Sequence, residues 1–485
     1  MKINYIHMKV YIYVKCIITS LNKSICKPSL LICIGLLSLG SGLKGQDVPT
    51  SHYEDLQERT AWFREARFGM FIHWGLYSIP ARGEWVRAQE RMNIEDYQVY
   101  FDEFNPVNYN PHVWAKLAKA AGMKYAVLTA KHHDGFCMWD TKTTDYKSTR
   151  TPANQDLVRT FLEAFRDEGL KVGLYYSLVD WYHPDYPAYG DRQHPMRDNE
   201  DWKGKVHKWD NYVGYMHEQV NELVTNYGEI DIMWFDFSYW SYRGEKWRAS
   251  ELVQMVREKQ PHILIDNRLG GDMEKNDPDV YAGDFDGPEQ GIPREPIRNE
   301  SGYLLPWEAC MTLNDSWGYK AKDYNYKTAQ DVIRYLTNAV SKGGNLLVNV
   351  GPNAYGEIPK RSQEILHSVG DWMSVNGEAI YGAGISEFDK PEWGRFTQKG
   401  DTLYAFLFQK HFGHIGLKGL KDKVIKARLV KDGSEVIVTP FWNDETSDFD
   451  EPDDIFLAFG KPVPLTYPLP DKLATVIRVH LKTDR

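Results

Sequence analysis

The chain has 485 residues, of which 42% are hydrophobic and 26% are charged, and its formal net charge is −9 at pH 7. This composition supports a large hydrophobic core and is not that of a disordered chain. The acidic balance, without a concentrated basic face, argues against a nucleic-acid partner, because phosphate binding needs clustered lysines and arginines. The aromatic share of 14% suits either sugar binding or simply a large aromatic core.

The first 45 residues carry only positive charges and include an apolar stretch at residues 29–39. We interpret this segment as a signal peptide, too short to span a membrane as a mature helix, and it predicts export to the periplasm or the extracellular space. Met8 is an alternative start, and both cleavage near Gly45 and retention as an anchor stay open. Three of the five cysteines lie in this leader, so the rest of the chain needs no disulfide scaffold.

From residue 46 to about 380 one pattern recurs: an amphipathic helical stretch, a glycine or proline, then a short apolar strand. Five such cycles favour a parallel sheet with helical crossovers. With a first strand at residues 70–72 and weaker candidates near Val280 and Ala309, the count approaches eight, which predicts a (β/α)8-type barrel. A doubly wound nucleotide-binding sheet is the alternative, but no glycine-rich phosphate loop follows the first strand. The five repeated strands are expected at residues 125–129, 172–176, 231–236, 263–265 and 346–350.

After about Tyr381 the pattern changes to period-two alternation with tight turns. Asp432-Gly433 predicts a hairpin between strands at residues 425–430 and 435–438, and further strands are expected at 402–408 and 475–481. We predict a C-terminal antiparallel β-sandwich at residues 381–485. Such a domain either binds carbohydrate or braces the barrel, and bracing is favoured because no exposed aromatic triad is evident.

Polar and aromatic side chains follow the predicted strands at their C-terminal ends, where α/β barrels place their chemistry. One apolar strand ends in Asp236, which is either a catalytic carboxylate or a cap of the following turn. Three histidines, an arginine and a carboxylate converging on one face favour a functional site over separate structural roles. These candidates are His73, His132, His133, Tyr175, Trp234, Asp236 and Arg268.

The run His132, His133 and Asp134 raises the alternative of a metal site. Ligands on a strand favour i, i+2 spacing, whereas adjacent histidines point to opposite faces while the chain is extended. No HxH or HExxH motif occurs elsewhere. We therefore predict no metal ligand and no cofactor.

Two carboxylates offer a different chemistry. Retaining glycosidases hold two carboxyl groups about 5 Å apart, one as nucleophile and the other as general acid and base. Asp236 is the candidate nucleophile. Spacing alone leaves its partner open among Asp284, Asp286, Glu289, Glu295 and Glu308.

An ordered set of short motifs extends over nearly the whole chain after the leader. With this set the sequence resembles the α-L-fucosidases of glycoside hydrolase family 29. The resemblance implies a barrel followed by a C-terminal β-sandwich, retention of anomeric configuration and no metal. The motifs are Arg67-Phe68-Gly69-Met70-Phe71-Ile72-His73-Trp74-Gly75, Gly83-Glu84-Trp85, Lys131-His132-His133-Asp134-Gly135-Phe136, Tyr175-Tyr176-Ser177, Trp234-Phe235-Asp236, Pro288-Glu289, Trp307-Glu308, Ser316-Trp317-Gly318-Tyr319 and Asn345-Leu346-Leu347-Val348-Asn349-Val350-Gly351-Pro352.

On this resemblance Asp236 matches the family nucleophile. Glu289 matches the Pro-Glu pattern that carries the acid/base in many relatives, and Glu295 and Glu308 are the alternatives. Glu308 is interpreted as a buried structural acid on a barrel strand. The resemblance also implies a fucose pocket lined by His73, Glu84, Trp85, His132, His133, Tyr175, Trp234, Arg268 and Trp317.

The expected function is therefore that of a retaining exo-α-L-fucosidase acting on fucosylated oligosaccharides or glycoconjugates, with no nucleic-acid partner and no membrane span after the leader. An inactive fucose-binding protein on the same scaffold and a metal-dependent hydrolase using His132, His133 and Asp134 are the alternatives. Residues 180–205, after the third strand, are expected to shape the leaving-group site. Acceptance of simple aryl fucosides is favoured over restriction to branched linkages, and the natural glycan and oligomeric state stay open.

Overall fold

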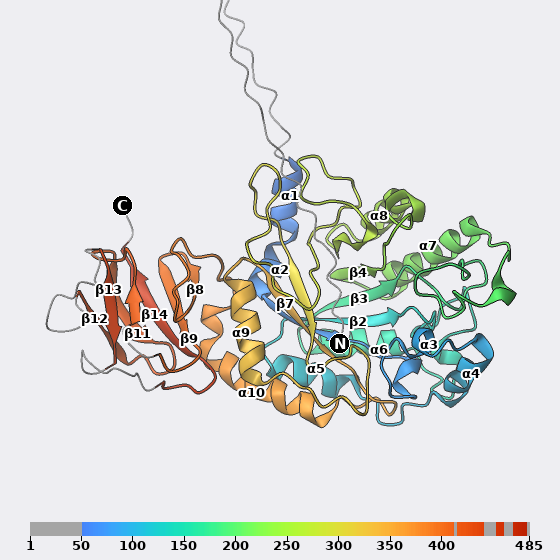
Figure 1. Cartoon of the computed structure of the whole chain (residues 1–485), viewed down its shortest axis with the longest axis horizontal. Coiled ribbons are helices and arrows are strands. Elements are labelled where there is room, and N and C mark those ends of the chain that lie inside the picture. Colours follow the sequence, from blue (N-terminus) through green and yellow to red (C-terminus); the bar gives the residue numbers. More distant parts are fainter. Residues whose placement is uncertain (1–50, 412–414, 441–452, 460–468, 483–485) are drawn as a thin grey trace, which may run out of the picture. The chain divides into compact units, whose positions relative to one another are not determined.

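The computed structural model describes residues 51–411, 415–440, 453–459 and 469–482. The predicted signal peptide at residues 1–45 lies outside the described residues. The described chain contains a seven-stranded parallel sheet followed by a seven-stranded antiparallel sheet (Figure 1). No helix in these ranges combines the length and apolar character that crossing a bilayer requires.

The parallel sheet has the strand order β5-β4-β3-β2-β1-β7-β6. All of its neighbouring strands pair in parallel, with helices α5, α6, α7, α8 and α9 as crossovers. The five predicted helix-strand cycles are thereby confirmed. The strands are β1 Phe68–Ile72, β2 Tyr125–Lys131, β3 Lys171–Ser177, β4 Ile232–Asp236, β5 Leu264–Ile265, β6 Glu308–Thr312 and β7 Asn345–Val350.

An irregular segment, residues 285–289, lies between the two edge strands β5 and β6. Phe285 forms a parallel bridge with Asp266 just after β5, and Glu289 forms one with Cys310 of β6. The backbone NH of Cys310 also donates to the carbonyl of Pro288 at 3.0 Å. This segment closes the sheet into a (β/α)8-like barrel, in which the eighth position is held by isolated bridges rather than by a regular strand.

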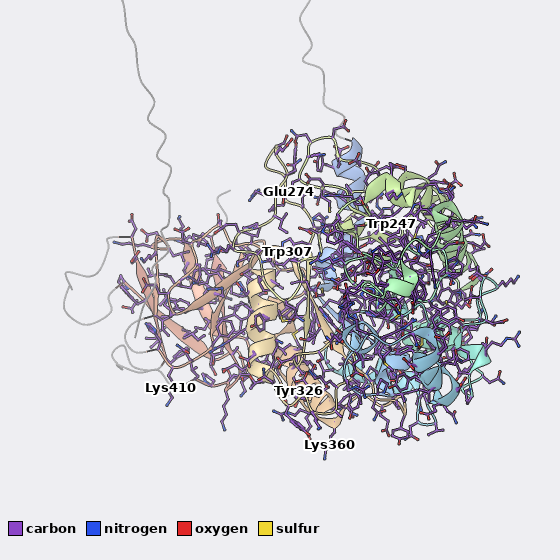
Figure 2. All side chains as sticks on the ribbon, turned by 45° about the vertical axis from the view of Figure 1, so that its right-hand side comes forward. Trp247, Glu274, Trp307, Tyr326, Lys360 and Lys410 are labelled. Atoms are coloured by element: carbon purple, nitrogen blue, oxygen red, sulfur yellow. The ribbon has the colours of Figure 1, made fainter. Side chains whose placement is uncertain are left out.

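The two faces of each barrel strand are buried against different neighbours, as the period of two requires. On β4, Ile232 and Trp234 belong to an apolar cluster inside the barrel, together with Tyr125 and Phe285. Met233 and Phe235 belong instead to the core that includes the surrounding helices. Asp236 follows the inward register, which directs its carboxylate to the C-terminal mouth of the barrel. The side chains that fill these layers are drawn in Figure 2, where buried Trp307, next to β6, is labelled.

The helices end where the sequence places glycine. Gly122, Gly169, Gly228 and Gly343 follow α5, α6, α7 and α9, and all have φ between +73° and +85°. This left-handed conformation ends a helix and costs glycine little, because glycine has no Cβ. The helices are α1 Ser51–Arg59, α2 Ala61–Ala66, α3 Val86–Gln89, α4 Ile94–Glu103, α5 Pro111–Ala120, α6 Leu157–Asp167, α7 Trp209–Asn226, α8 Ala249–Lys259, α9 Ala329–Val340 and α10 Lys360–Asn376.

The second sheet is antiparallel, with the order β10-β13-β12-β11-β14-β9-β8. The predicted hairpin is confirmed, since β11 and β12 pair on either side of Asp432-Gly433. Residues from both edge strands, Phe396 and Ile415, contribute to one hydrophobic core, as in a sandwich. The predicted boundary at 380/381 falls between α10 and this sheet, whose strands are β8 Gly394–Lys399, β9 Thr402–Leu407, β10 Ile415–Leu417, β11 Val424–Leu429, β12 Glu435–Thr439, β13 Ile455–Ala458 and β14 Thr475–Leu481.

One strand candidate is wrong and another is right. Val280 lies in a turn with 63% of its surface exposed, because no apolar face surrounds it in the polar run of residues 276–279. Ala309 lies on β6 and is fully buried.

Candidate active site

Asp236 is the last residue of β4, and its side chain is only 12% exposed. Its Oδ1 accepts a hydrogen bond from Arg268 Nη1 at 2.8 Å, and its Oδ2 accepts one from the Tyr175 hydroxyl at 2.7 Å. Burial alone would raise the pKa of Asp236, but the charge of Arg268 and the hydrogen bonds from Tyr175 and Arg268 outweigh burial and lower it. The group is therefore an ionised carboxylate at neutral pH, oriented by two donors.

Glu289 ends the irregular segment that closes the barrel, and its side chain is 44% exposed. Its Oε2 lies 3.3 Å from Arg268 Nη1, the nitrogen that also binds Asp236. Because both carboxylate oxygens contact one nitrogen, they lie no more than about 6 Å apart. Retaining glycosidases separate their carboxyl groups by about 5–5.5 Å and inverting enzymes by about 6.5–9.5 Å. The shared contact with Arg268 thus fits the retaining spacing.

Arg268 lies in the short 3-10 turn Asn267–Leu269 that follows β5. Its guanidinium stacks over the Trp234 ring, 4.4 Å from the ring centroid, and its Nη2 donates to the carbonyl of Gly287 at 2.9 Å. Burial opposes the charge of Arg268, but neighbouring Asp236 outweighs burial and raises the pKa. A permanent cation is therefore fixed between the two candidate carboxylates.

Three buried histidines, His73, His132 and His133, also line the pocket. Burial lowers the pKa of His73 to about 3, that of His133 to about 4 and that of His132 well below its ordinary value. All three imidazoles are consequently neutral at neutral pH. His73 Nδ1 lies 2.7 Å from Asn349 Oδ1, and His133 Nδ1 lies 2.7 Å from Ser177 Oγ.

The adjacent histidines do not point to opposite faces. Strand β2 ends at Lys131, so His132 and His133 lie in the turn that follows, and their ring centroids are 4.1 Å apart. Asp134 does not join them, because its carboxylate accepts hydrogen bonds from the Tyr97 hydroxyl and from a backbone NH. Over the residues that the structure describes, no group of three or more histidine, cysteine or acidic side chains is arranged to hold a metal ion.

Aromatic rings form the remaining wall of the pocket. The Trp85 ring lies 5.0 Å from that of His133, and the Trp317 ring lies 5.0 Å from that of His73. Phe237 follows Asp236 with φ of +80°, a strained conformation for an aromatic residue, and its ring lies 4.6 Å from that of His133. The strain turns the chain directly after the carboxylate, so that Phe237 also faces the pocket.

The pocket encloses about 370 Å³ of space, its open mouth included. Ten of the eleven predicted site residues line it, and the exception is Glu84. Glu84 is buried, accepts a hydrogen bond from the NH of Gly318 at 2.8 Å and has a pKa raised by burial, so it fixes the chain beside Trp317. Its direct contact with a sugar stays a prediction. The lining comprises His73, Trp85, His132, His133, Tyr175, Trp234, Asp236, Arg268, Glu289 and Trp317, and three residues that were not predicted: Phe71, Phe237 and Cys310.

The other acidic candidates lie elsewhere. Glu308 is 1% exposed on β6 and accepts a hydrogen bond from the Tyr125 hydroxyl inside the barrel, below the pocket lining. Burial raises its pKa to about 8. Glu295 is exposed on a loop. Asp284 is buried in ion pairs with Arg59 and Arg257.

A protein-family model described as alpha-L-fucosidase matches residues 44–378. The chain belongs to the α-L-fucosidase family.

Similar proteins agree with this family. The tissue alpha-L-fucosidase of Mus musculus is 31% identical over 404 residues, which cover 77% of this chain and 83% of that protein. The structure of alpha-L-fucosidase isoenzyme 1 from Paenibacillus thiaminolyticus is 57% identical, has a TM-score of 0.85 and matches 88% of this chain and 100% of that one. A Bacteroides thetaiotaomicron family 29 alpha-L-fucosidase, solved as a trapped covalent intermediate with 2-fluoro-fucosyl fluoride, is 28% identical, has a TM-score of 0.73 and matches 88% and 96% of the two chains.

Membership of this family gives the pocket its chemical context. The sequence resemblance to family 29 is confirmed, and the paired carboxylates, neutral imidazoles and aromatic rings lie in one pocket of a fucosidase fold.

Proposed function

We propose that the protein is a retaining exo-α-L-fucosidase that releases terminal L-fucose from oligosaccharides or glycoconjugates. The observation that carries this proposal is the contact of one nitrogen, Arg268 Nη1, with the carboxylates of both Asp236 and Glu289, which line a small pocket. A pocket of this small size suits a terminal sugar residue better than an internal one. The neutral histidines and aromatic rings suit the hydroxyls and the apolar ring face and methyl group of fucose.

In the first step Asp236 attacks C1 of the fucoside. The C1–O bond to the leaving group breaks, and Glu289 transfers its proton to the departing oxygen, which leaves a covalent fucosyl ester on Asp236. In the second step Glu289 removes a proton from water, the water oxygen attacks C1, and the ester bond to Asp236 breaks. Two inversions give L-fucose with retained configuration. The lowered pKa of Asp236 keeps the nucleophile ionised, and Arg268 holds both carboxylates in place.

The test is release of nitrophenol from 4-nitrophenyl α-L-fucoside by the wild type, Asp236→Ala and Glu289→Ala, each with and without azide. We expect Asp236→Ala to lose activity and azide to restore part of the activity of Glu289→Ala, with fucosyl azide as the product. Full activity of Glu289→Ala would transfer the acid/base role to Glu295 or Glu308. An inactive wild type that still binds fucose would favour the binding-only alternative.

The metal-hydrolase alternative has less support, because Asp134 faces Tyr97 and not the pocket.

Specificity for the leaving group is proposed to depend on residues 180–205, which begin beside the pocket: the Trp181 ring lies 5.3 Å from that of Trp85. Exchange of this segment for that of a relative with another linkage preference should change the preference. An unchanged preference would reject this role.

We also propose that the protein is exported. The charge pattern and apolar stretch of residues 1–45 support this proposal. N-terminal sequencing of the protein recovered from the periplasm or medium tests it, and an uncleaved protein confined to the cytoplasm would reject it.

A further inference from the structure

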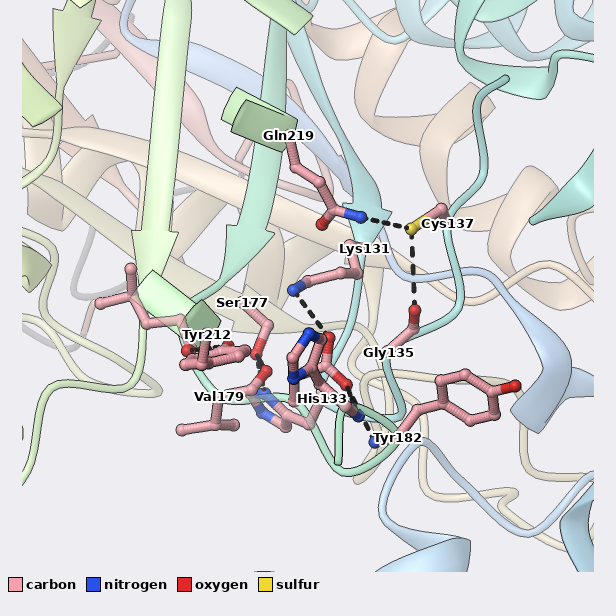
Figure 3. Close-up of polar contacts among 12 residues, drawn as sticks. Lys131, His133, Gly135, Cys137, Ser177, Val179, Tyr182, Tyr212 and Gln219 are labelled. Carbon is pink, nitrogen blue, oxygen red and sulfur yellow. Dashed lines mark hydrogen bonds and ion pairs between the residues drawn. The ribbon is translucent and has the colours of Figure 1, made fainter. Parts of the chain in front are cut away.

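Ser177, the last residue of β3, lies directly behind the pocket residue His133. The serine is fully buried, and its Oγ lies 2.7 Å from His133 Nδ1 and 2.7 Å from the carbonyl oxygen of Val179 (Figure 3). A serine hydroxyl has a single proton, and a carbonyl oxygen only accepts. The Ser177 proton is therefore directed at Val179, and Ser177 Oγ accepts a hydrogen bond from His133 Nδ1–H.

The neutral imidazole of His133 then has an unprotonated Nε2. This nitrogen lies 3.9 Å from Asp236 Oδ2, on the side of the pocket. Neither atom can donate a hydrogen bond to the other. A sugar hydroxyl about 2.8 Å from Nε2 could donate its single proton to this nitrogen. His133 thus presents an acceptor beside the carboxylate.

The carbonyl that receives the Ser177 proton is held in place by a buried ion pair. Lys131 Nζ and Asp180 Oδ2 are 3.1 Å apart, and their side chains are 0% and 1% exposed. Asp180 Oδ1 also accepts hydrogen bonds from the backbone NH groups of Tyr182 and His183, both at 2.9 Å. These contacts fix the chain at Asp180, directly after Val179, and so help to keep the Val179 carbonyl directed at Ser177 (Figure 3).

A second imidazole of the pocket, that of His73, is also protonated on Nδ1. Asn349 Nδ2 donates to the carbonyl of Trp317 at 2.7 Å, which leaves Oδ1 of Asn349 to accept from His73 Nδ1–H at 2.7 Å. In contrast, His132 Nδ1 is buried without a hydrogen-bond partner among the described residues. Two of the three histidines are thus fixed by groups outside the pocket.

We propose that Ser177 is a positioning residue of the enzyme, which selects the Nδ1-protonated form of His133 and so makes Nε2 an acceptor for a hydroxyl of the bound sugar. This inference rests on the proposed fucosidase function. The hydroxyl of Ser177 acts only through the histidine.

NMR can show which nitrogen of His133 carries the proton, and this measurement does not depend on enzyme activity. In protein labelled with ¹⁵N-histidine, NMR should show a proton coupled to Nδ1 of His133 and none on Nε2, with the signal assigned by its loss in His133→Phe. A proton on Nε2 in the wild type would overturn the proposal. In Ser177→Ala the Nδ1–H loses its acceptor, and the signal should shift or become a mixture of the two forms.

Kinetics then test the consequence. Ser177→Ala should lower kcat/KM for 4-nitrophenyl α-L-fucoside by about 10- to 100-fold, because a misplaced imidazole no longer holds the sugar hydroxyl in its productive position. Ser148→Ala is the matched control, because Ser148 is equally buried and donates to a backbone carbonyl, that of Gln155, away from the pocket. In the His133→Phe background the same Ser177→Ala change should have little further effect.

Equal kinetics of Ser177→Ala and Ser148→Ala would overturn the proposal. A loss of the same size in the His133→Phe background would overturn it too, because the serine would then act on the fold alone. If the wild type hydrolyses no α-L-fucoside, the proposed function fails, while the NMR result still decides the protonated nitrogen of His133.

Discussion

Removal of one hydroxyl, in Tyr175→Phe, tests the electrostatics of Asp236 most directly. The Tyr175 hydroxyl donates to Asp236 Oδ2 at 2.7 Å inside the protein, and the tyrosine is 1% exposed. Hydrogen bonds to charged groups contribute about 1.5–3 kcal/mol. One pKa unit corresponds to about 1.4 kcal/mol, so the pKa of Asp236 should rise by roughly one to two units.

The direction of the pH shift follows from the ionisation of Asp236. Asp236 has to be ionised to attack, so kcat/KM falls when the pH drops through the pKa of Asp236 in the free enzyme. In Tyr175→Phe the acid limb of the kcat/KM profile should therefore move to higher pH by one to two units. Arg268 Nη1 still contacts the carboxylate at 2.8 Å, so the loss should appear mainly at acidic pH.

The assay is hydrolysis of 4-nitrophenyl α-L-fucoside from pH 3 to 8, with nitrophenol measured after quenching in base. Tyr176→Phe is the control, because Tyr176 is the next residue on β3, is equally buried and has its hydroxyl 2.7 Å from Gln219, on the opposite face of the strand. Its acid limb should coincide with that of the wild type. An unmoved acid limb in Tyr175→Phe, or an equal movement in Tyr176→Phe, would refute the reasoning.

Three further results are expected. Glu308 has a pKa of about 8 in the folded protein and an ordinary value near 4.5, so the folded state binds its proton more tightly than the unfolded state does. The free energy of unfolding of the wild type therefore decreases as the pH rises from about 4.5 to 8. Glu308→Gln should therefore gain thermal stability relative to the wild type as pH rises from about 4.5 to 8, and a constant difference in Tm would contradict the assignment. Lys131→Met should destabilise by about 3–5 kcal/mol, since it leaves Asp180 buried without its ion-pair partner, and Lys131→Met/Asp180→Asn should recover part of this loss in urea unfolding. Dialysis against EDTA should leave activity unchanged, and a loss that Zn²⁺ restores would revive the metal hydrolase.

The regular strands could be predicted because their local sequence and their environment agree. Along residues 231–236 the side chains of β4 point alternately into the barrel and toward the helical layer. This alternation places Asp236 at the mouth of the barrel. The residues at or directly after the C-terminal ends of strands β1, β2, β3 and β5 could be assigned to the same end for the same reason. Hence most of the pocket lining was available from the order of motifs.

The eighth position of the barrel could not be predicted in this way. Residues 285–289 read Phe-Asp-Gly-Pro-Glu, and glycine and proline are depleted in strands. Their place depends on bridges to β5 and β6, which are tertiary contacts. The weak strand signal near Val280 is misleading, because Val280 is exposed.

Details of side-chain direction were also beyond the sequence. The left-handed φ of Phe237 has no signal in an aromatic residue, so its contribution to the pocket was missed. The prediction that the two adjacent histidines diverge holds only for an extended chain, and the sequence does not show that His132 and His133 lie in a turn after β2. Ser177 and Asn349 occur in the quoted motifs, but their hydrogen-bond partners come from other strands and loops.

Because the barrel is closed by an irregular segment, the backbone that carries Glu289 is held less firmly than the backbone that carries Asp236. Asp236 belongs to a strand that is paired with β3 along its whole length, whereas Glu289 is joined to β6 through one bridge and a few backbone bonds. On heating, the proton donor should therefore lose its place before the nucleophile does. A leaving group such as nitrophenolate needs little protonation, and a sugar alkoxide needs much. Near the upper temperature limit, aryl fucosides should still be cleaved when natural glycans no longer are, and a thermostability measured on the former alone would overstate the working range on the latter.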